Sequence, residues 1–268
     1  EALPIELEQK AFTLTRKQVN LGPEKIKEKY EVTLPKDITE HYKNALLAYR
    51  LGDKSTEQKI VLMQMLSILC GGFHAQYKHD AKSSLLVSIL KTELKNEAVV
   101  IWCAFNAEVE GITKLLRKYF KTAEYVTGEV SLKKRKLLVD SFQRGDYKYL
   151  VAQIKCAKFG LDLSAADTAI YYSNQYAMED RLQSEDRILS TEKTNPLLYV
   201  DLVARNTVEE KETKGEEVEV PTPEELEDTV DPGEYDVDQD TLDEYPVLVE
   251  MGFNIGDVLV VEEGKPWS

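Results

Sequence analysis

Gln183 and Arg187 are the pair of residues whose types and spacing best suit phosphate chemistry in this chain. They lie four positions apart in a stretch that predicts a helix over about 177–189, so they share one face of that helix. A guanidinium on this face can bind a phosphate through two parallel hydrogen bonds, because its planar donors match the oxygens. The alternative for Arg187 is a surface ion pair with Asp186 or Glu185.

The segment before this pair holds a second set of candidates. The run from Leu150 to Ile154 is short and apolar, which predicts a buried parallel strand, and the following loop contains Lys155, Gly160 and Asp162. Ligands of parallel sheets bind beyond the strand ends, so a nucleotide could reach this loop. Gly160 and Asp162 would equally suit a tight turn that binds nothing, and the residues alone leave both interpretations open.

A run of four basic residues occupies positions 133–136. Residues 1–207 hold 31 Lys and Arg against 27 Asp and Glu, whereas residues 208–268 hold 3 against 21. The net charge of −14 therefore belongs to the last part of the chain, and the body is mildly basic at +4. The basic run could bind a phosphate backbone or be the solvated face of a helix.

The elements that must position these residues alternate along the second half of the chain. An α/β fold with a doubly wound parallel sheet is predicted by this order. Strands are expected at 99–104, 123–126, 149–153, 168–173 and 197–203, and helices at about 106–120, 131–143 and 177–189.

The first part of the chain predicts a connector followed by helices. Residues 1–35 are mixed and include an alternating strand of Tyr30, Val32 and Leu34. Helical spacing of apolar residues predicts three helices, one after Asp37, one from about Ser55 to Gly71 and one over about 81–94, whose apolar faces we expect to be core. We expect a connector and helical segment (1–95), a doubly wound α/β lobe (96–207) and an acidic, largely disordered tail (208–268).

Composition excludes several other classes. No run of 18 apolar residues and no basic, apolar leader occurs, so we expect neither membrane insertion nor secretion, and a cytoplasmic location. Cys70, Cys103 and Cys156 are odd in number, widely spaced and set among apolar residues. They predict packed, reduced thiols, and no metal site is predicted.

Residues 150–187, LVAQIKCAKFGLDLSAADTAIYYSNQYAMEDRLQSEDR, resemble motifs V and VI in the C-terminal RecA-like lobe of Swi/Snf-type helicases of superfamily two. Other segments match in collinear order from about Phe12 to Lys211. VVIWCAFNAEVEGITKLL (99–116) resembles motif IV, VTGEVSLKKRKLLVDSFQRGD (126–146) the segment after it, and DLVARNTVEEK (201–211) the closing strand. The run AYRLGDKSTEQ resembles a helical segment of phage members, which would place the protein in the host cytoplasm.

The resemblance implies roles for individual residues. It implies that Gly160, Asp162, Gln183 and Arg187 bind nucleotide, with Arg187 catalytic, and that Thr127, Gly128, Arg135 and Lys155 hold the backbone of double-stranded DNA. Such backbone contacts position DNA without reading its sequence. ATP and Mg²⁺ are the implied cofactors.

The chain lacks part of what this chemistry needs. It has no GxxxxGK[ST] loop, which the family keeps on an N-terminal first lobe, so that lobe is an implied partner. Relatives continue from the first motif VI arginine as Ile-His-Arg-Ile-Gly-Gln, whereas this chain has Ser190 at the second arginine. Because an arginine finger contributes about 10³ to 10⁵ in turnover, hydrolysis is not expected from this chain alone.

Three functional hypotheses follow. The first is the second lobe of a Swi/Snf-like ATP-dependent DNA helicase or translocase. The second is a catalytically inactive RecA-like module, derived from a helicase, that binds DNA or protein. An independent nucleotide-binding enzyme of another class is disfavoured, because no glycine-rich phosphate loop opens a helix.

Overall fold

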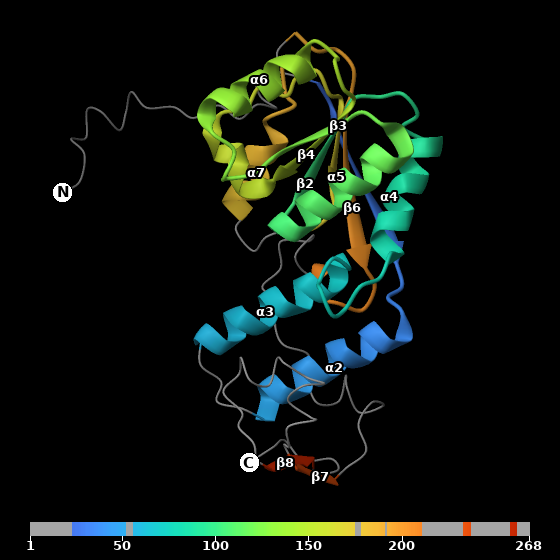
Figure 1. Cartoon of the computed structure of the whole chain (residues 1–268), viewed down its shortest axis with the longest axis vertical. Helices are drawn as coiled ribbons and strands as arrows, with labels where there is room; N and C mark the ends of the chain where they lie inside the picture. Colours follow the sequence, from blue (N-terminus) through green and yellow to red (C-terminus); the bar gives the residue numbers. More distant parts are fainter. Residues whose placement is uncertain are drawn as a thin grey trace, which may run out of the picture.

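The computed structural model describes residues 23–51, 56–174, 178–190, 192–210, 233–236 and 258–261. Its centre is a six-stranded sheet of order β1-β6-β5-β2-β4-β3, and each neighbouring pair of strands runs parallel (Figure 1). The predicted doubly wound parallel sheet is confirmed. The strands are β1 (Lys25–Val32), β2 (Val99–Cys103), β3 (Ala123–Val126), β4 (Tyr149–Gln153), β5 (Thr168–Tyr171) and β6 (Leu197–Ala204).

Alternation along the strands divides the core between the two faces of the sheet. Val100 and Trp102 of β2 join one buried cluster, while Val99, Ile101 and Cys103 join another. Helices α4 (Ala81–Thr92) and α5 (Asn106–Phe120) supply apolar residues to the second cluster. On the opposite face lie α6 (Leu132–Gln143), the 3₁₀ helix η1 (Ile154–Phe159) and α7 (Met178–Glu185). Both faces are covered, as a parallel sheet requires.

Helices α2 (Lys36–Leu51) and α3 (Thr56–Gly71) form a separate layer beyond the carboxyl end of β6 (Figure 1). Their buried residues include Leu46, Met63 and Leu66, as the helical spacing predicts. Ala204, at the end of β6, and Val208 join the same cluster. The chain leaving the sheet therefore packs against this helical layer.

The predicted connector of residues 1–35 needs correction, because residues 25–32 belong to the sheet. Strand β1 pairs in parallel with β6 along its whole length, from Lys25 opposite Leu197 to Val32 opposite Ala204. It begins earlier than the predicted alternation and ends before Leu34. Residues with a charged, exposed pattern can still form an edge strand, since one partner satisfies half of their backbone groups. Residues 1–22 lie outside the described part of the chain.

The division at 95/96 also differs from the packing. Leu86, Ile89 and Leu90 of α4 share a buried cluster with β2, so α4 and the sheet form one unit. At the other end, Val208 and Glu209 are buried, which places the start of the predicted tail inside the folded body. Within that tail, β7 (Gly233–Asp236) and β8 (Val258–Val261) pair antiparallel. The remaining predicted tail lies outside the described residues.

Two elements are shorter than predicted. Strand β5 ends at Tyr171 and helix α7 ends at Glu185, so Arg187 lies in a turn after the helix. The chain turns there so that Ile188 enters the core with no exposed surface.

Among the described residues, no helix is long and apolar enough to cross a bilayer. The three cysteines are buried and free, as predicted.

Candidate functional site

Thr127 and Gly128 follow directly after β3, where the chain leaves the sheet. Thr127 is buried, and Gly128 is exposed in the turn. A Cβ added to Gly128 would meet Gln153 Oε1 at 3.9 Å, so this turn lies beside the carboxyl end of β4. The turn and the start of η1 therefore border one another.

Arg135 is buried, unlike the lysines that flank it, with only 5% of its surface exposed. Its Nη2 donates to the carbonyl oxygens of Val130 at 3.0 Å and Thr127 at 3.4 Å. The guanidinium carbon lies 4.1 Å from the ring centroid of Phe159 at the end of η1. Arg135 thus braces the 127–130 turn against η1, and its Nε and Nη1 have no hydrogen-bond partner.

The three neighbours of Arg135 in the basic run, at 133, 134 and 136, are exposed on α6. Lys155 is exposed as well, on η1, together with Lys158. These lysines are exposed to solvent on this side of the sheet, whereas Arg135 is buried. All four residues of the basic run 133–136 carry the same charge. They differ in exposure because successive positions of a helix point in different directions, and only Arg135 points inward.

Gly160 ends η1 with φ of 67°, a left-handed conformation that glycine adopts without strain. Asp162 is exposed, and its Oδ1 accepts a hydrogen bond from the backbone N–H of Ser164 at 3.1 Å. The carbonyl oxygen of Asp162 accepts from Gln143 Nε2 at 2.9 Å. The predicted strand-to-helix turn is instead a 3₁₀ helix between two strands, with Gly160 as its C-cap and Asp162 in the loop that follows.

Arg187 lies beside Gly160. A Cβ built on Gly160 would stand 4.0 Å from Arg187 Nη1, and the backbone N–H of Leu163 donates to the Arg187 carbonyl at 2.9 Å. Arg187 Nε donates to the Gln183 carbonyl at 3.1 Å, whereas the Gln183 side chain donates to Glu179. Within the described residues Arg187 makes no ion pair, so the predicted alternative of a pair with Asp186 or Glu185 is not what the structure shows.

The structure thus brings the candidates together in one strip across a single face of the sheet. The turn at 127–128 borders η1, Arg135 stacks on Phe159, and Gly160 contacts Arg187. Asp162 and the side chain of Gln183 belong to the strip but engage local partners. The strip offers exposed lysines and a guanidinium with spare donors, which is a surface that can bind phosphate groups.

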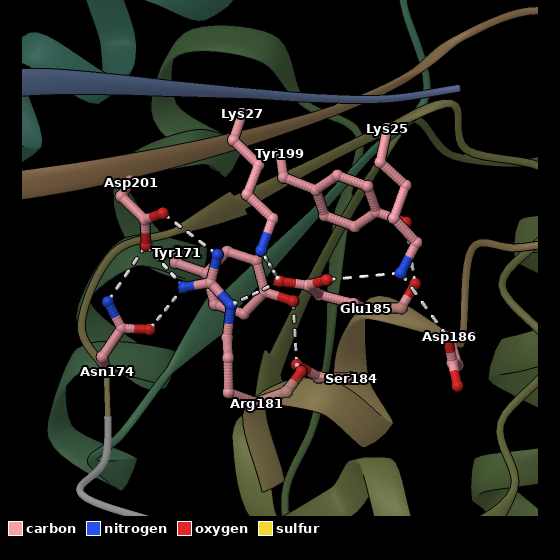
Figure 2. Close-up of polar contacts among 10 residues, drawn as sticks. All are labelled: Lys25, Lys27, Tyr171, Asn174, Arg181, Ser184, Glu185, Asp186, Tyr199 and Asp201. Carbon is pink, nitrogen blue, oxygen red and sulfur yellow. Dashed lines mark hydrogen bonds and ion pairs between the residues drawn. The ribbon is translucent and has the colours of Figure 1, made fainter. Parts of the chain in front are cut away.

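A network of charges that the sequence analysis did not identify anchors α7 to the sheet (Figure 2). Arg181 pairs with Asp201 of β6, with Nη1–Oδ1 at 2.5 Å and Nη2–Oδ2 at 3.0 Å. Asn174, just beyond β5, accepts from Arg181 at 2.7 Å and donates to Asp201 at 3.0 Å. The Arg181 guanidinium carbon lies 3.3 Å from the ring centroid of Tyr171.

Glu185 at the end of α7 completes this network. It is buried, and its Oε1 accepts from Lys27 Nζ at 2.9 Å and from Arg181 Nε at 3.2 Å, while Oε2 accepts from Lys25 Nζ at 3.3 Å. Burial raises the pKa of Glu185, but the hydrogen bond and charge of Lys27 with those of Arg181 and Lys25 outweigh it, so the net pKa is lowered. The i,i+4 spacing of Arg181 and Glu185 and the alternating Lys25 and Lys27 were the available sequence signals.

A second buried network lies on the opposite face. Lys82 of α4 is fully buried and pairs with Glu209 at 2.6 Å. Glu108 of α5 accepts from Ser173 Oγ at 2.5 Å and from the Phe105 backbone N–H at 3.3 Å. Burial raises the pKa of Glu108 to about 7, although Ser173 and Lys82 act in the opposite direction. No periodic pattern in the sequence signals this network, because its members come from segments far apart in the chain.

The described residues suit phosphate groups better than a metal ion. They contain no group of three or more His, Cys, Asp or Glu that could hold a cation. Within the described part of the chain, Arg187 Nη1 and Nη2 have no hydrogen-bond partner, and a guanidinium with such donors suits an anionic phosphate.

Comparison with known proteins agrees with this geometry. The family described as "Helicase conserved C-terminal domain" matches residues 81–191. The ATP-dependent helicase fft1 of Schizosaccharomyces pombe is 28% identical over 132 residues, which are 49% of this chain and 14% of that protein. The chain therefore spans about a seventh of this curated relative.

Solved structures share the fold. The C-terminal part of the Fun30 ATPase domain superposes with a TM-score of 0.59 and 14% identity, covering 86% of this chain and 97% of that one. The Sulfolobus solfataricus SWI2/SNF2 ATPase core in complex with double-stranded DNA has a TM-score of 0.58 and 19% identity, covering 71% of this chain and 43% of that one. Residues 81–191 thus match a helicase C-terminal domain, and the chain shares the fold of the C-terminal part of the Fun30 ATPase domain and of the SWI2/SNF2 ATPase core.

Proposed function

We propose that the chain acts as the second lobe of an ATP-dependent DNA translocase of the Swi2/Snf2 type. In this role it contributes the strip from the 127–128 turn to Arg187, and a first lobe contributes the phosphate loop and the ligands of Mg²⁺. ATP bound between the lobes supplies the phosphoryl-transfer chemistry. This chain's own residues bind phosphate charge, hold the DNA backbone and keep Arg187 in place.

The observation that carries the proposal is the contact between Arg187 and Gly160. A guanidinium without an acidic partner among the described residues stands beside a left-handed glycine that leaves its Nη1 uncovered. A Cβ at position 160 would narrow this space. Arg187 therefore retains donors for a phosphate, whereas Arg181, six residues earlier, spends its donors on Asp201, Asn174 and Glu185.

For DNA, exposure favours the lysines and the backbone of the turn. Lys155 and Gly128 are accessible on the same side as the lysines of α6, and Thr127 is buried behind them. Arg135 contributes by holding the turn and η1 together, since its own guanidinium is covered by Phe159. This arrangement supports backbone binding without base recognition.

Arg187→Ala tests the nucleotide part of the proposal. A first lobe of the Swi2/Snf2 type is fused ahead of residue 1 or mixed with the chain, and ATP turnover is measured with double-stranded DNA. We expect turnover by the wild type and a loss of about a thousandfold in Arg187→Ala. Arg144→Ala is the matched control, because Arg144 is exposed at the end of α6 and pairs only with its neighbours Ser141 and Asp146. Absence of turnover by the wild type with every first lobe would refute the proposal.

Lys155→Ala tests the DNA part, because Lys155 is exposed and its removal leaves the fold intact. Binding of a double-stranded oligonucleotide is followed as salt rises, and a lost phosphate contact reduces the slope by about one. Lys114→Ala on α5 is the control, since Lys114 is 78% exposed on the opposite face and pairs only with Glu110. Equal slopes in the two variants would exclude Lys155 from the DNA surface.

A second candidate function is supported by Ser190. This residue stands where relatives have the second motif VI arginine, and its hydroxyl accepts from the backbone N–H of Glu192 at 3.3 Å in a local turn. A module with this substitution would bind DNA or protein without turnover. DNA binding by the chain together with no turnover under any pairing, including by a Ser190→Arg variant, would favour this candidate.

A further inference from the structure

Helix α7 is held on the sheet by polar contacts rather than by an apolar face. It has eight residues, fewer than the roughly 12 to 15 at which isolated helices become marginally stable. Leu182, in its middle, is 54% exposed, while Ser184 and Glu185 are buried. The placement of α7, and of the turn carrying Arg187, therefore depends on the partners of its polar side chains.

Those partners come from three strands of the sheet. Near the start of α7, Arg181 engages Asp201 of β6 and the ring of Tyr171 of β5. The Tyr171 hydroxyl lies 2.8 Å from Ser184 Oγ, and the Tyr199 hydroxyl donates to the Glu185 carbonyl at 2.9 Å. These contacts lie on one side of the helix, facing the sheet (Figure 2).

The end of α7 is held from β1, a strand about 160 residues earlier in the chain. Lys27 and Lys25 reach Glu185 from alternate positions of this edge strand, and Lys25 also lies 3.6 Å from Asp186. The Glu185 side chain is only 3% exposed, whereas Lys27 is 58% exposed. The Glu185 carboxylate thus lies buried against the sheet, and its negative charge is balanced by Lys27, a partly solvated lysine of β1.

Arg187 follows Glu185 by two residues. Its Nε donates to the carbonyl of Gln183, which couples the guanidinium to the last turn of α7, while its own carbonyl accepts from the Leu163 backbone N–H of the loop after η1. A shift of the Glu185 end would change the distance between Arg187 and Gly160. Misplacement of a catalytic group by about 1 Å can lower turnover by about a hundredfold.

We propose that Glu185, held by Lys25 and Lys27 of β1 and by Arg181 of its own helix, is a positioning residue that sets where the Arg187 guanidinium lies. Strand β1 thereby helps to position the residue that is proposed to bind nucleotide, although no residue of β1 is proposed to contact nucleotide itself. The inference rests on the function proposed above for Arg187.

Lys27→Ala removes one of the ion pairs between β1 and Glu185. Glu185→Gln removes the charge of the carboxylate while keeping nearly the same side-chain shape. Lys29→Ala is the matched control, because Lys29 lies on the same strand and the same face but pairs with Glu31 at 2.6 Å. With a first lobe supplied, we expect kcat to fall about tenfold in the two test variants, which is within the range typical of mutations along a coupled network. The KM for ATP should stay unchanged in both. Lys29→Ala should match the wild type.

Double variants separate positioning from general destabilisation. If Lys27 acts through Arg187, Lys27→Ala lowers turnover of the wild type but has no further effect in the Arg187→Ala background. The full additional loss in that background would overturn the proposal. The thermal midpoints of Lys27→Ala and Lys29→Ala are measured alongside, because Lys27 pairs with the buried Glu185 and its loss can lower stability as well as turnover.

A readout at Arg187 itself needs no turnover. The Arg187 Nε–H signal in a ¹⁵N correlation spectrum of the whole chain is identified by its loss in Arg187→Ala. We expect it to shift or broaden in Lys27→Ala and Glu185→Gln and to remain in place in Lys29→Ala. An unchanged signal in both test variants overturns the positioning role even if the lobe is active. A shifted signal in a lobe that never turns over supports positioning and refutes the proposed function instead.

Discussion

Arg135 and Arg187 carry the same side chain into opposite surroundings. Arg135 is 95% buried against Phe159 and two carbonyl groups, whereas Arg187 is half-buried, with one bond to the backbone of its own turn. The same guanidinium is thus a brace in one place and an available donor in the other. Burial, rather than residue type, decides which arginine can meet a phosphate.

Glu108 gives the lobe a specific dependence of stability on pH. Its folded-state pKa of about 7 lies above the ordinary 4.5, so its contribution is full below about pH 4.5 and is lost as pH rises through 7. Glu108→Gln removes this cost while retaining an acceptor for Ser173. In urea unfolding we expect the variant to lose less stability than the wild type between pH 5 and pH 8, by up to about 3 kcal/mol. Parallel pH profiles for the two proteins would contradict this assignment.

Substitutions at Gly160 distinguish a structural role in the turn from a functional role beside Arg187. At φ of 67° an alanine is strained, and its Cβ would have only Arg187 Nη1 near it, at 4.0 Å. We expect Gly160→Ala to destabilise the chain by about 1 kcal/mol in urea unfolding. Gly160→Asn should cost less, since asparagine tolerates this conformation. If both variants fold but only the larger asparagine side chain lowers ATP turnover with a first lobe, the space beside Arg187 is functional. If turnover is equal in the two variants, the role of Gly160 is limited to forming the turn.

At the scale of elements, the turn after β3, α6 and η1 form one assembly. Arg135 of α6 donates to the carbonyls of Thr127 and Val130 and covers Phe159 of η1. Ser131 caps α6, with its hydroxyl accepting from the Lys134 backbone N–H at 3.4 Å. The basic run of the sequence thus has a structural member and three solvated ones.

Arg135→Ala should act on stability first. It leaves the Val130 carbonyl without this donor, which costs about 1 to 3 kcal/mol when such a group is buried, whereas the Thr127 carbonyl still accepts from the Val130 backbone N–H at 3.2 Å. We expect a lower urea midpoint and weaker DNA binding together. Lys134→Ala is the control, and it should lower only the salt dependence of DNA binding. A stable Arg135→Ala variant that loses DNA binding alone would assign Arg135 a direct DNA contact.

At the scale of the whole molecule, the Lys82–Glu209 pair fixes the end of the lobe. Glu209 accepts from Lys82 through Oε1 and from the Ala204 backbone N–H at 2.8 Å through Oε2, so it ties the chain after β6 to α4. Burial lowers the pKa of Lys82, but the charge and hydrogen bond of Glu209 outweigh it and raise it. The pair therefore keeps a buried lysine charged.

Glu209→Ala should leave Lys82 buried without its partner, which typically costs about 3 to 5 kcal/mol. We expect a matching fall in the free energy of unfolding, measured in urea. Lys82→Met in the same background should restore part of it, because the unpaired charge is gone. Glu210→Ala is the control, since Glu210 is partly exposed and its Oε1 accepts a long bond of 3.3 Å from the Asn206 backbone N–H. Similar losses in both single variants would show that the pair is not the anchor.

The sequence alone determined the alternation of elements and the order of the motifs. Strands such as Val99–Cys103 and Tyr149–Gln153 are apolar and short enough to be read without their neighbours, and helix periods located α3 and α5. The motif residues Gly160, Gln183 and Arg187 were identifiable for the same reason, since their spacing is local.

Only the tertiary structure decided which charges are partners. Lys25 and Lys27 are about 160 residues from Glu185, and Lys82 is 127 residues from Glu209. Sheet order brings β1 next to β6, and no local pattern encodes that order. The inward turn of Arg135 and the end of α7 before Arg187 were likewise set by packing, because the stacking of Arg135 on Phe159 and the burial of Ile188 compete with the local preference of the chain. Local spacing thus specified the candidate residues, and long-range packing specified which of them remain free to bind.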